Sequence, residues 1–257
     1  MGVQKLRKGG MANKARKNSI FVVYEGHREE IFLEYLGSLS NVRLNTLPNG
    51  GGSADQIVNI GIIRSARDIK VYAFFDEDFE TRPEYNISDE TIESLAKSWK
   101  CEKGKLKGCP YNQLQTLNMD MQNPILIISH PKSIEGLILR LLNRPLDTLE
   151  EKTTTQLKGE IASFLDSTVL TDEDRVTLQF YDRKISNYLE KIKIIQQNDP
   201  QDKKQPRYLE GKIKDYQRRK NKVTFMRFLN EKLPLSVMTA KRRDILEIDI
   251  LLSAFGL

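Results

Sequence analysis

Four short apolar runs, each closed by polar or glycine-containing residues, limit the fold more than any other feature of the sequence. A segment with helical periodicity follows each run, so that strands alternate with helices. The expected strands cover residues 19–24, 42–47, 69–75 and 124–129, and the expected helices cover 27–39, 54–67, about 88–99 and 133–143. This alternation predicts a parallel sheet, because parallel neighbours need a crossover connection. Residues 19–145 are therefore expected to form an α/β domain with about four parallel strands flanked by helices.

The pattern changes after Pro145, where helical periodicity continues and no strand is expected. The expected helices cover about 153–166, 172–197, 206–232 and 237–254. Residues 146–257 are therefore expected to form an all-helical C-terminal domain. Residues 1–18 are basic and lack apolar periodicity, so they are expected to be a flexible tail.

Composition excludes several broad classes of protein. With 39% hydrophobic and 30% charged residues in 257, the chain can bury a core. No apolar run approaches the roughly 20 residues that cross a bilayer, and no secretory signal precedes the first strand, so we expect a soluble cytoplasmic protein without a membrane partner. Cys101 and Cys109 have seven residues between them, a spacing that matches neither a zinc pair nor a redox pair.

Positive charge is concentrated in two segments. The six lysines and arginines before Ile20 account for the whole formal net charge of +6. The segment from Arg183 to Lys222 contains thirteen lysines and arginines but only five acids. Such a segment is typical of a protein that binds a phosphate backbone, although a solvated helix face would show the same charges. The candidate nucleic-acid-binding residues are Lys212, Lys214, Arg218, Arg219, Lys220 and Lys222. Tyr208, Tyr216 and Phe225 lie among them and could stack on bases.

Acidic residues follow two of the expected strands. Glu25 comes directly after the first strand, and Asp76 and Asp78 come directly after the third. The carboxyl ends of parallel strands meet at one edge of a sheet, and residues i and i+2 of an extended chain share a side. These three carboxylates therefore predict a site for Mg²⁺ or Mn²⁺, both of which prefer oxygen ligands. Gly26 would let a phosphate or a metal approach the backbone.

Three further polar residues lie near the expected strand ends. Glu29 is one helical turn beyond Glu25, and Glu135 lies in the first turn of the helix expected at 133–143. His130 follows the fourth strand and could orient a phosphate or transfer a proton. Each has a plainer interpretation: a solvated helix residue for Glu29, an acid favoured by the helix dipole for Glu135, and polar surface for His130.

Two motifs resemble the signature of the TOPRIM domain, a family that comprises topoisomerases, DnaG-type primases, OLD-family nucleases and small ribonucleases. The first apolar run ends in Glu25-Gly26-His27-Arg28-Glu29, and the third ends in Asp76-Glu77-Asp78-Phe79. The segment Ser129-His130-Pro131-Lys132-Ser133-Ile134-Glu135-Gly136 further resembles a motif of the RloB and AriB group, which is paired with ABC-type ATPases in phage defence. The resemblance covers about residues 19–143.

The resemblance implies magnesium-dependent phosphodiester chemistry. Glu25 would do general acid or base work or bind metal, and Asp76 with Asp78 would hold Mg²⁺. Glu29 matches the acid that often follows the glutamate-glycine pair in nucleolytic members. The third motif adds its own residues as weaker catalytic candidates: His130, Lys132 and Glu135.

On this resemblance we expect a toxic nuclease effector of an anti-phage system, held inactive by an ABC-type ATPase partner until a trigger releases it. RNA, including tRNA, is favoured over DNA as the substrate. Three alternatives stay open: an OLD-like DNA endonuclease, a scaffold without catalysis that binds an ATPase, and a phosphatase with Asp76 as its nucleophile. The helical second half would supply substrate contacts, homodimerisation or partner docking.

Overall fold

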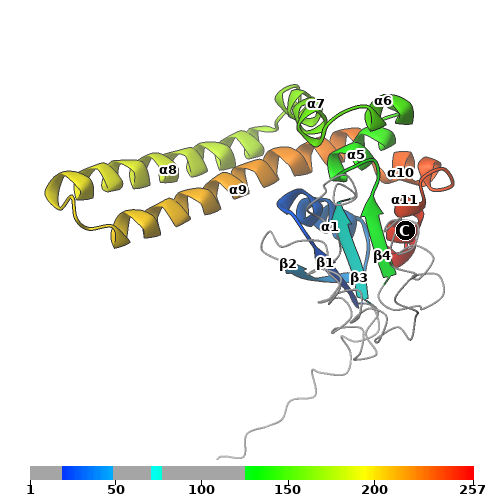
Figure 1. The fold of residues 1–257 in the computed structure, drawn as a ribbon, viewed down its shortest axis with the longest axis horizontal. Coiled ribbons are helices and arrows are strands. Elements are labelled where there is room, and N and C mark those ends of the chain that lie inside the picture. The colour runs from blue at the N-terminus through cyan, green and yellow to red at the C-terminus, as the bar shows by residue number, and fades with distance from the viewer. Residues whose placement is uncertain (1–18, 49–70, 77–124) are drawn as a thin grey trace, which may run out of the picture. The chain divides into compact units, whose positions relative to one another are not determined.

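A computed structural model describes residues 19–48, 71–76 and 125–257 of the chain (Figure 1). The expected tail at 1–18, the helices expected at 54–67 and 88–99, and Asp78 lie outside the described residues. Contacts divide the chain into two units. The first comprises residues 1–134 and 241–257, and the second comprises residues 135–240. We describe each unit by itself.

The first unit contains a sheet of four parallel strands. The strands are β1 (Ser19–Tyr24), β2 (Arg43–Pro48), β3 (Val71–Asp76) and β4 (Ile125–Ser129), and their order across the sheet is β2-β1-β3-β4 (Figure 1). All three neighbouring pairs are parallel. The structure therefore confirms the predicted α/β fold class with a four-stranded parallel sheet, and each strand lies within one or two residues of its expected position.

The two middle strands are buried, as their apolar sequences require. Val22, Val23 and Tyr24 of β1 are at most 1% exposed, and residues 71–74 of β3 are at most 2% exposed. A parallel strand that is covered on both faces reads as a continuous apolar run rather than an alternating one. The run at 69–75 predicts such a central strand, and β3 indeed lies between β1 and β4.

Two helices from opposite ends of the described chain pack with this sheet. Helix α1 (His27–Leu39) contacts β2, and α11 (Leu246–Phe255) contacts both β4 and α1. Gly37 lies where the elements meet, because a Cβ atom there would lie 3.7 Å from Leu44 and 3.8 Å from Phe255. Residues 241–257 thus group with the sheet, whereas the sequence pattern places them in the helical domain.

The remaining described helices belong mainly to the second unit. They are α5 (Ile134–Leu141), α6 (Leu146–Glu150), α7 (Thr154–Asp166), α8 (Asp172–Asn198), α9 (Lys204–Lys232) and α10 (Leu235–Lys241). The structure confirms the expected helical C-terminal region. None of the helices in the described ranges is long and apolar enough to cross a membrane.

The helix expected at 237–254 is wrong in one respect, because the chain breaks between α10 and α11. Arg242 lies at the break and makes contacts that depend on it: its Nε donates to Asp249 at 2.5 Å, and its terminal nitrogens donate to Ser253 at 2.7 Å and to the Leu257 carbonyl at 3.1 Å. The arginine can reach these partners on and beyond α11 only if the chain turns before that helix begins. Ile245 accordingly has an extended backbone at the N-cap of α11.

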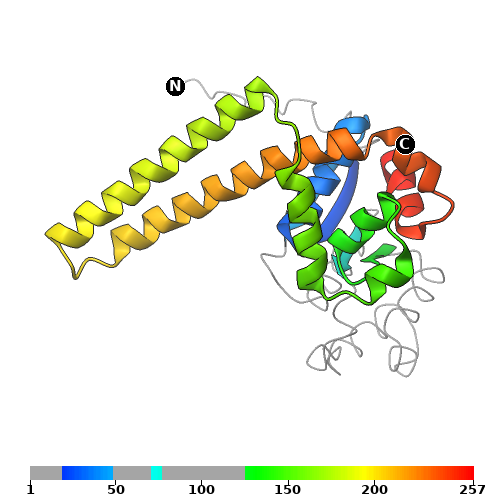
Figure 2. The ribbon, with the colours of Figure 1, turned by 90° about the horizontal axis from the view of Figure 1, so that it is seen from above.

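Helices α8 and α9 form a long antiparallel hairpin (Figures 1 and 2). A capping box starts α8, since Thr171 accepts from the Asp174 N–H and the Asp174 carboxylate accepts from the Thr171 N–H. Between the helices, the ring of Tyr216 lies 5.8 Å from that of Tyr181 and 5.9 Å from that of Tyr188. These aromatic contacts hold the two helices in register.

Candidate functional site

Glu25 and Asp76 follow neighbouring strands at the same edge of the sheet. Tyr24 of β1 pairs with Phe74 of β3, so the next residues of both strands reach the carboxyl edge together. Glu25 directly follows β1 and Asp76 is the last residue of β3. Both residues are half-buried. The topology thus brings together two of the three carboxylates that the sequence predicts for the metal site.

The N-terminus of α5 orients the Asp76 carboxylate. The Ile134 backbone N–H donates to Asp76 Oδ1 at 2.9 Å. Ser129, the last residue of β4, pairs with Asp76 across the sheet. An ionised carboxylate is favoured at a helix N-terminus, where backbone N–H groups and the helix dipole both meet it. Asp76 is therefore held in one orientation by main-chain groups that no side-chain pattern reveals.

The loop between β4 and α5 makes this contact possible. The peptide bond between His130 and Pro131 is cis, and Lys132 has a φ of 63°. The Ser133 N–H then donates to the Pro131 carbonyl at 2.7 Å, which closes a tight turn before Ile134. A left-handed backbone at a lysine is uncommon. His130 and Lys132, both candidates from the sequence, thus lie at the same edge of the sheet as Asp76.

Glu29 is buried beside the turn that follows Glu25. It is 3% exposed, which excludes the solvated position considered above. Gly26 is the N-cap of α1, and a Cβ atom at Gly26 would lie only 2.5 Å from Glu29 Oε2. The Glu29 carboxylate therefore occupies the space that a side chain at Gly26 would need. Glycine is required here because the Glu29 carboxylate approaches so closely. The backbone conformation of Gly26 is not the reason, since that conformation is extended and any residue could adopt it.

Tyr24, the residue before Glu25, keeps its proton. Its ring is 1% exposed. Burial raises the pKa of the Tyr24 hydroxyl well above its ordinary value, and the nearby Glu30 carboxylate adds to the rise. The Glu30 carboxylate also lies 2.9 Å from His27 Nδ1. Tyr24 therefore stays neutral across the physiological range of pH.

Glu135 lies in the first turn of α5 and is 2% exposed. It follows Ile134, the residue that bonds Asp76, along the chain. Its burial shows that it is not an ordinary surface acid placed only to complement the helix dipole.

The described residues include two of the three carboxylates that the sequence predicts for a metal site, Glu25 and Asp76. Within the described ranges, no three or more His, Cys, Asp or Glu side chains gather closely enough to hold an ion. Asp78, the third predicted ligand, lies outside those ranges. The donor chemistry fits nonetheless, since Glu25, Asp76 and Asp78 would offer carboxylate oxygens alone, which suits Mg²⁺ or Mn²⁺ rather than zinc.

The basic residues of α9 lie mostly on its outer side. Lys214, Arg218 and Lys222 recur every four residues and share one stripe of the helix. Lys212 lies over the ring of Tyr208, with its ammonium 5.4 Å from the centroid, and Arg219 lies 5.6 Å from that of Tyr216. We call this set the basic face of α9; it consists of Lys212, Lys214, Arg218, Arg219 and Lys222.

Two residues predicted to contact nucleic acid turn inward instead. Lys220 forms an ion pair with Asp182 of α8. Phe225 is 2% exposed and stacks on Phe228, so it belongs to the core of the second unit. Tyr208, by contrast, is 65% exposed and remains a candidate for base stacking. Helical phase distinguishes these positions, because side chains on the packed side of α9 make contacts within the second unit instead of facing solvent.

Comparisons with known proteins found no matching family model, no matching curated protein and no matching solved structure.

Proposed function

We propose that this chain is a Mg²⁺- or Mn²⁺-dependent nuclease with its catalytic centre at the carboxyl edge of the parallel sheet. The observation that carries this proposal is the placement of Glu25 and Asp76 at the carboxyl ends of the two central, adjacent strands. One or two carboxylates that share a site are the usual protein ligands of a catalytic Mg²⁺. The sequence motifs that resemble TOPRIM domains add support, because they fall on these same strand ends.

Each residue has a distinct role in this proposal. Glu25, Asp76 and Asp78 would hold the cation, which supplies charge stabilisation to the phosphodiester when it is bound. The Ile134 N–H keeps Asp76 in a fixed orientation, so that little reorganisation is needed on binding. Glu29, buried against Gly26, is suited to positioning and to general acid or base work beside Glu25.

The basic face of α9 supports nucleic acid as the substrate. Lys214, Arg218 and Arg219 are exposed, and Tyr208 adds an exposed ring beside Lys212. Such a face would bind the phosphate backbone without sequence preference, while the exposed ring stacks on a base. These contacts do not distinguish RNA from DNA.

We further propose that the protein is the toxic effector of an anti-phage system, that it cleaves RNA, including tRNA, and that an ABC-type ATPase partner controls it. The support is the motif resemblance to the RloB and AriB group. A homodimer through the helical unit is compatible with this role.

The test compares the wild type with Glu25→Gln, which removes one charge and keeps the side-chain shape. Each chain is induced in cells, the RNA ends are sequenced and genomic DNA is inspected. The purified chains are then assayed with Mg²⁺ and with EDTA. Glu30→Gln is the matched control, since Glu30 is a nearby acid in the first turn of α1 that pairs with His27.

The outcomes separate the candidate functions. New RNA ends with the wild type and with Glu30→Gln, but not with Glu25→Gln or EDTA, support the ribonuclease. Fragmented DNA would replace it with an OLD-like DNA endonuclease. Hydrolysis of small phosphate esters that depends on Asp76 but not on Glu25 would indicate the phosphatase. If no variant cleaves anything even with the ATPase and a phage trigger present, the catalytic proposal fails and a scaffold role remains.

A further inference from the structure

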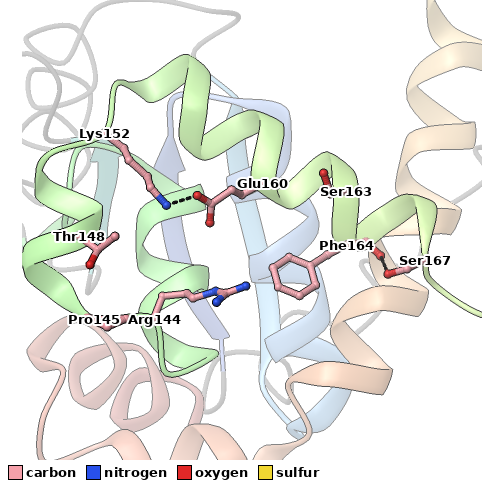
Figure 3. Close-up of a pocket in the computed structure, with 8 residues that line it drawn as sticks. All are labelled: Arg144, Pro145, Thr148, Lys152, Glu160, Ser163, Phe164 and Ser167. Carbon is pink, nitrogen blue, oxygen red and sulfur yellow. Dashed lines mark hydrogen bonds and ion pairs between the residues drawn. The ribbon is translucent and has the colours of Figure 1, made fainter.

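The helical unit contains a pocket with charged walls. Its residues belong neither to the proposed catalytic centre nor to the basic face of α9. Its volume is about 430 Å³, and its walls come from the turn after α5, from α6 and from α7 (Figure 3). This size falls in the range of about 300 to 1,000 Å³ that is typical of small-molecule sites.

Backbone motifs on both sides hold the pocket in place. At the end of α5, Asn143 has a φ of 64°, and its N–H donates to the Arg140 carbonyl at 3.0 Å. The Arg144 N–H donates to the Leu139 carbonyl at 3.0 Å, which completes a Schellman motif. At the start of α7, Thr153 forms a capping box with Gln156. The positions of Arg144 and Lys152 are therefore set by the local fold.

Arg144 is the strongest anion-binding group in the pocket. Its guanidinium carbon lies 5.8 Å from the centroid of the Phe164 ring, and the two side chains point toward one another (Figure 3). The Phe164 ring lies in turn 6.1 Å from the Phe228 ring. Among the described residues, the guanidinium makes no hydrogen bond or ion pair, so its five N–H donors remain for a ligand. A guanidinium fork matches the two oxygens of a phosphate or a carboxylate.

The rest of the wall favours a ligand that also carries a ring and hydrogen-bond donors. Lys152 forms an ion pair with Glu160, so the pocket holds two cations and one carboxylate. The Ser163 hydroxyl donates to the Gly159 carbonyl at 3.2 Å, and the Ser167 hydroxyl donates to the Phe164 carbonyl at 2.8 Å. Both hydroxyl oxygens therefore keep lone pairs that can accept from a ligand. The half-buried Phe164 ring supplies apolar surface for a flat group.

We propose that this pocket binds a nucleotide, with its phosphate on Arg144 and its base against the Phe164 ring. An oxyanion, a flat ring and donor groups occur together in a nucleoside monophosphate, and the pocket is larger than inorganic phosphate alone needs. The nucleotide is either free or the 5′-terminal residue of a nucleic acid. The site lies wholly within residues 144–167 and does not depend on the proposed nuclease activity.

The test is isothermal titration of the full chain in EDTA, on a Glu25→Gln background so that no nucleic acid is cut. The probes are AMP, GMP, CMP and UMP, together with adenosine, inorganic phosphate, and a short oligonucleotide with and without a 5′-phosphate. We expect at least one nucleotide probe to bind once per chain and to bind more tightly than adenosine or inorganic phosphate.

Variants then assign the binding to this pocket. Arg144→Gln is expected to weaken binding about 10- to 100-fold, the usual effect of losing a hydrogen-bonded charge. Arg144→Lys keeps the charge but loses the fork, so it should also weaken binding. Arg243→Gln removes an exposed arginine outside the pocket and should change nothing. Thermal unfolding curves confirm that each variant is folded.

The source of the nucleotide follows from the probes. Tight binding of a monophosphate assigns a free nucleotide, and binding of the oligonucleotide only with its 5′-phosphate assigns a nucleic-acid end. The proposal is overturned if no nucleotide probe binds at millimolar concentration, or if binding is equal in the wild type and Arg144→Gln.

Discussion

Replacing Gly26 with alanine tests the proposed centre through a single added methyl group. The new Cβ atom would lie 2.5 Å from Glu29 Oε2 and 3.4 Å from Glu29 Cδ. Ordinary contact begins near 3.4 Å, so the carboxylate has to move by about 1 Å. The backbone need not change, because Gly26 has φ −119° and ψ 175°, which alanine adopts without strain. The variant thus displaces a buried carboxylate and leaves the turn in place.

The expected effect falls on activity far more than on stability. A displacement of about 1 Å in a catalytic constellation can cost roughly 100-fold in rate. The free energy of unfolding should change by less than about 1 kcal/mol, since alanine is a weaker N-cap than glycine but lowers the entropy of the unfolded chain. The assay is Mg²⁺-dependent cleavage of the RNA identified by end sequencing, paired with urea unfolding.

Gly159→Ala is the matched control for this substitution. A Cβ atom at Gly159 would meet nothing within 4 Å, and the residue lies inside α7. It should stabilise the protein by up to about 1 kcal/mol and leave cleavage unchanged. The double variant of Gly26→Ala with Glu29→Ala should be no slower than Glu29→Ala alone, because the clash has lost its partner. Full activity of Gly26→Ala would refute a role for the Glu29 carboxylate.

Three other predictions concern the helical unit. Thr171→Ala removes the cap of α8 and should cost about 1 kcal/mol in urea unfolding. Burial opposes ionisation of Asp174, but hydrogen bonds from Thr171 and the charge of Arg227 outweigh it and lower its pKa below 3.8. This stabilisation is present above pH 3.8 and is lost as the pH falls through the lowered pKa of Asp174. The difference in unfolding free energy between wild type and Thr171→Ala should therefore narrow in acid. A difference that does not change with pH would contradict the role given to the Thr171–Asp174 hydrogen bonds. Arg218→Gln should reduce the slope of log binding constant against log salt concentration by about 0.7 to 0.9 for nucleic-acid binding. Lys220→Gln, which loses only its pair with Asp182, should leave that slope unchanged. Equal slopes for the two variants would argue against the basic face of α9.

Local sequence patterns predicted the elements of the fold well. Helices leave an apolar periodicity of 3.6 residues and buried parallel strands leave a continuous apolar run, and these runs place the strands within one or two residues of their observed bounds. The order of elements was enough to predict a parallel sheet. The pairing of β1 with β3 also brought Glu25 and Asp76 to one edge, as the fold class requires.

Contacts between residues that are distant in sequence leave no such local pattern. The bond from the Ile134 N–H to Asp76 spans 58 positions and involves a backbone group that every residue except proline carries. The break before α11 is accompanied by contacts of Arg242 with Ser253 and Leu257, and helical periodicity does not reveal such contacts. Lys220 likewise reads as one more surface cation until the hairpin places it opposite Asp182.

The return of α11 to the sheet has a consequence for how the protein is made. The sheet unit needs residues 241–257, yet the whole helical unit at 135–240 is synthesised between β4 and α11. At about 5 to 20 residues per second, a ribosome takes roughly 5 to 20 s to traverse that insertion. When this interval ends, the helical unit has all of its own chain, while the sheet unit still lacks its last helix. A nascent chain would therefore have its insertion ready to fold before the sheet unit can be completed.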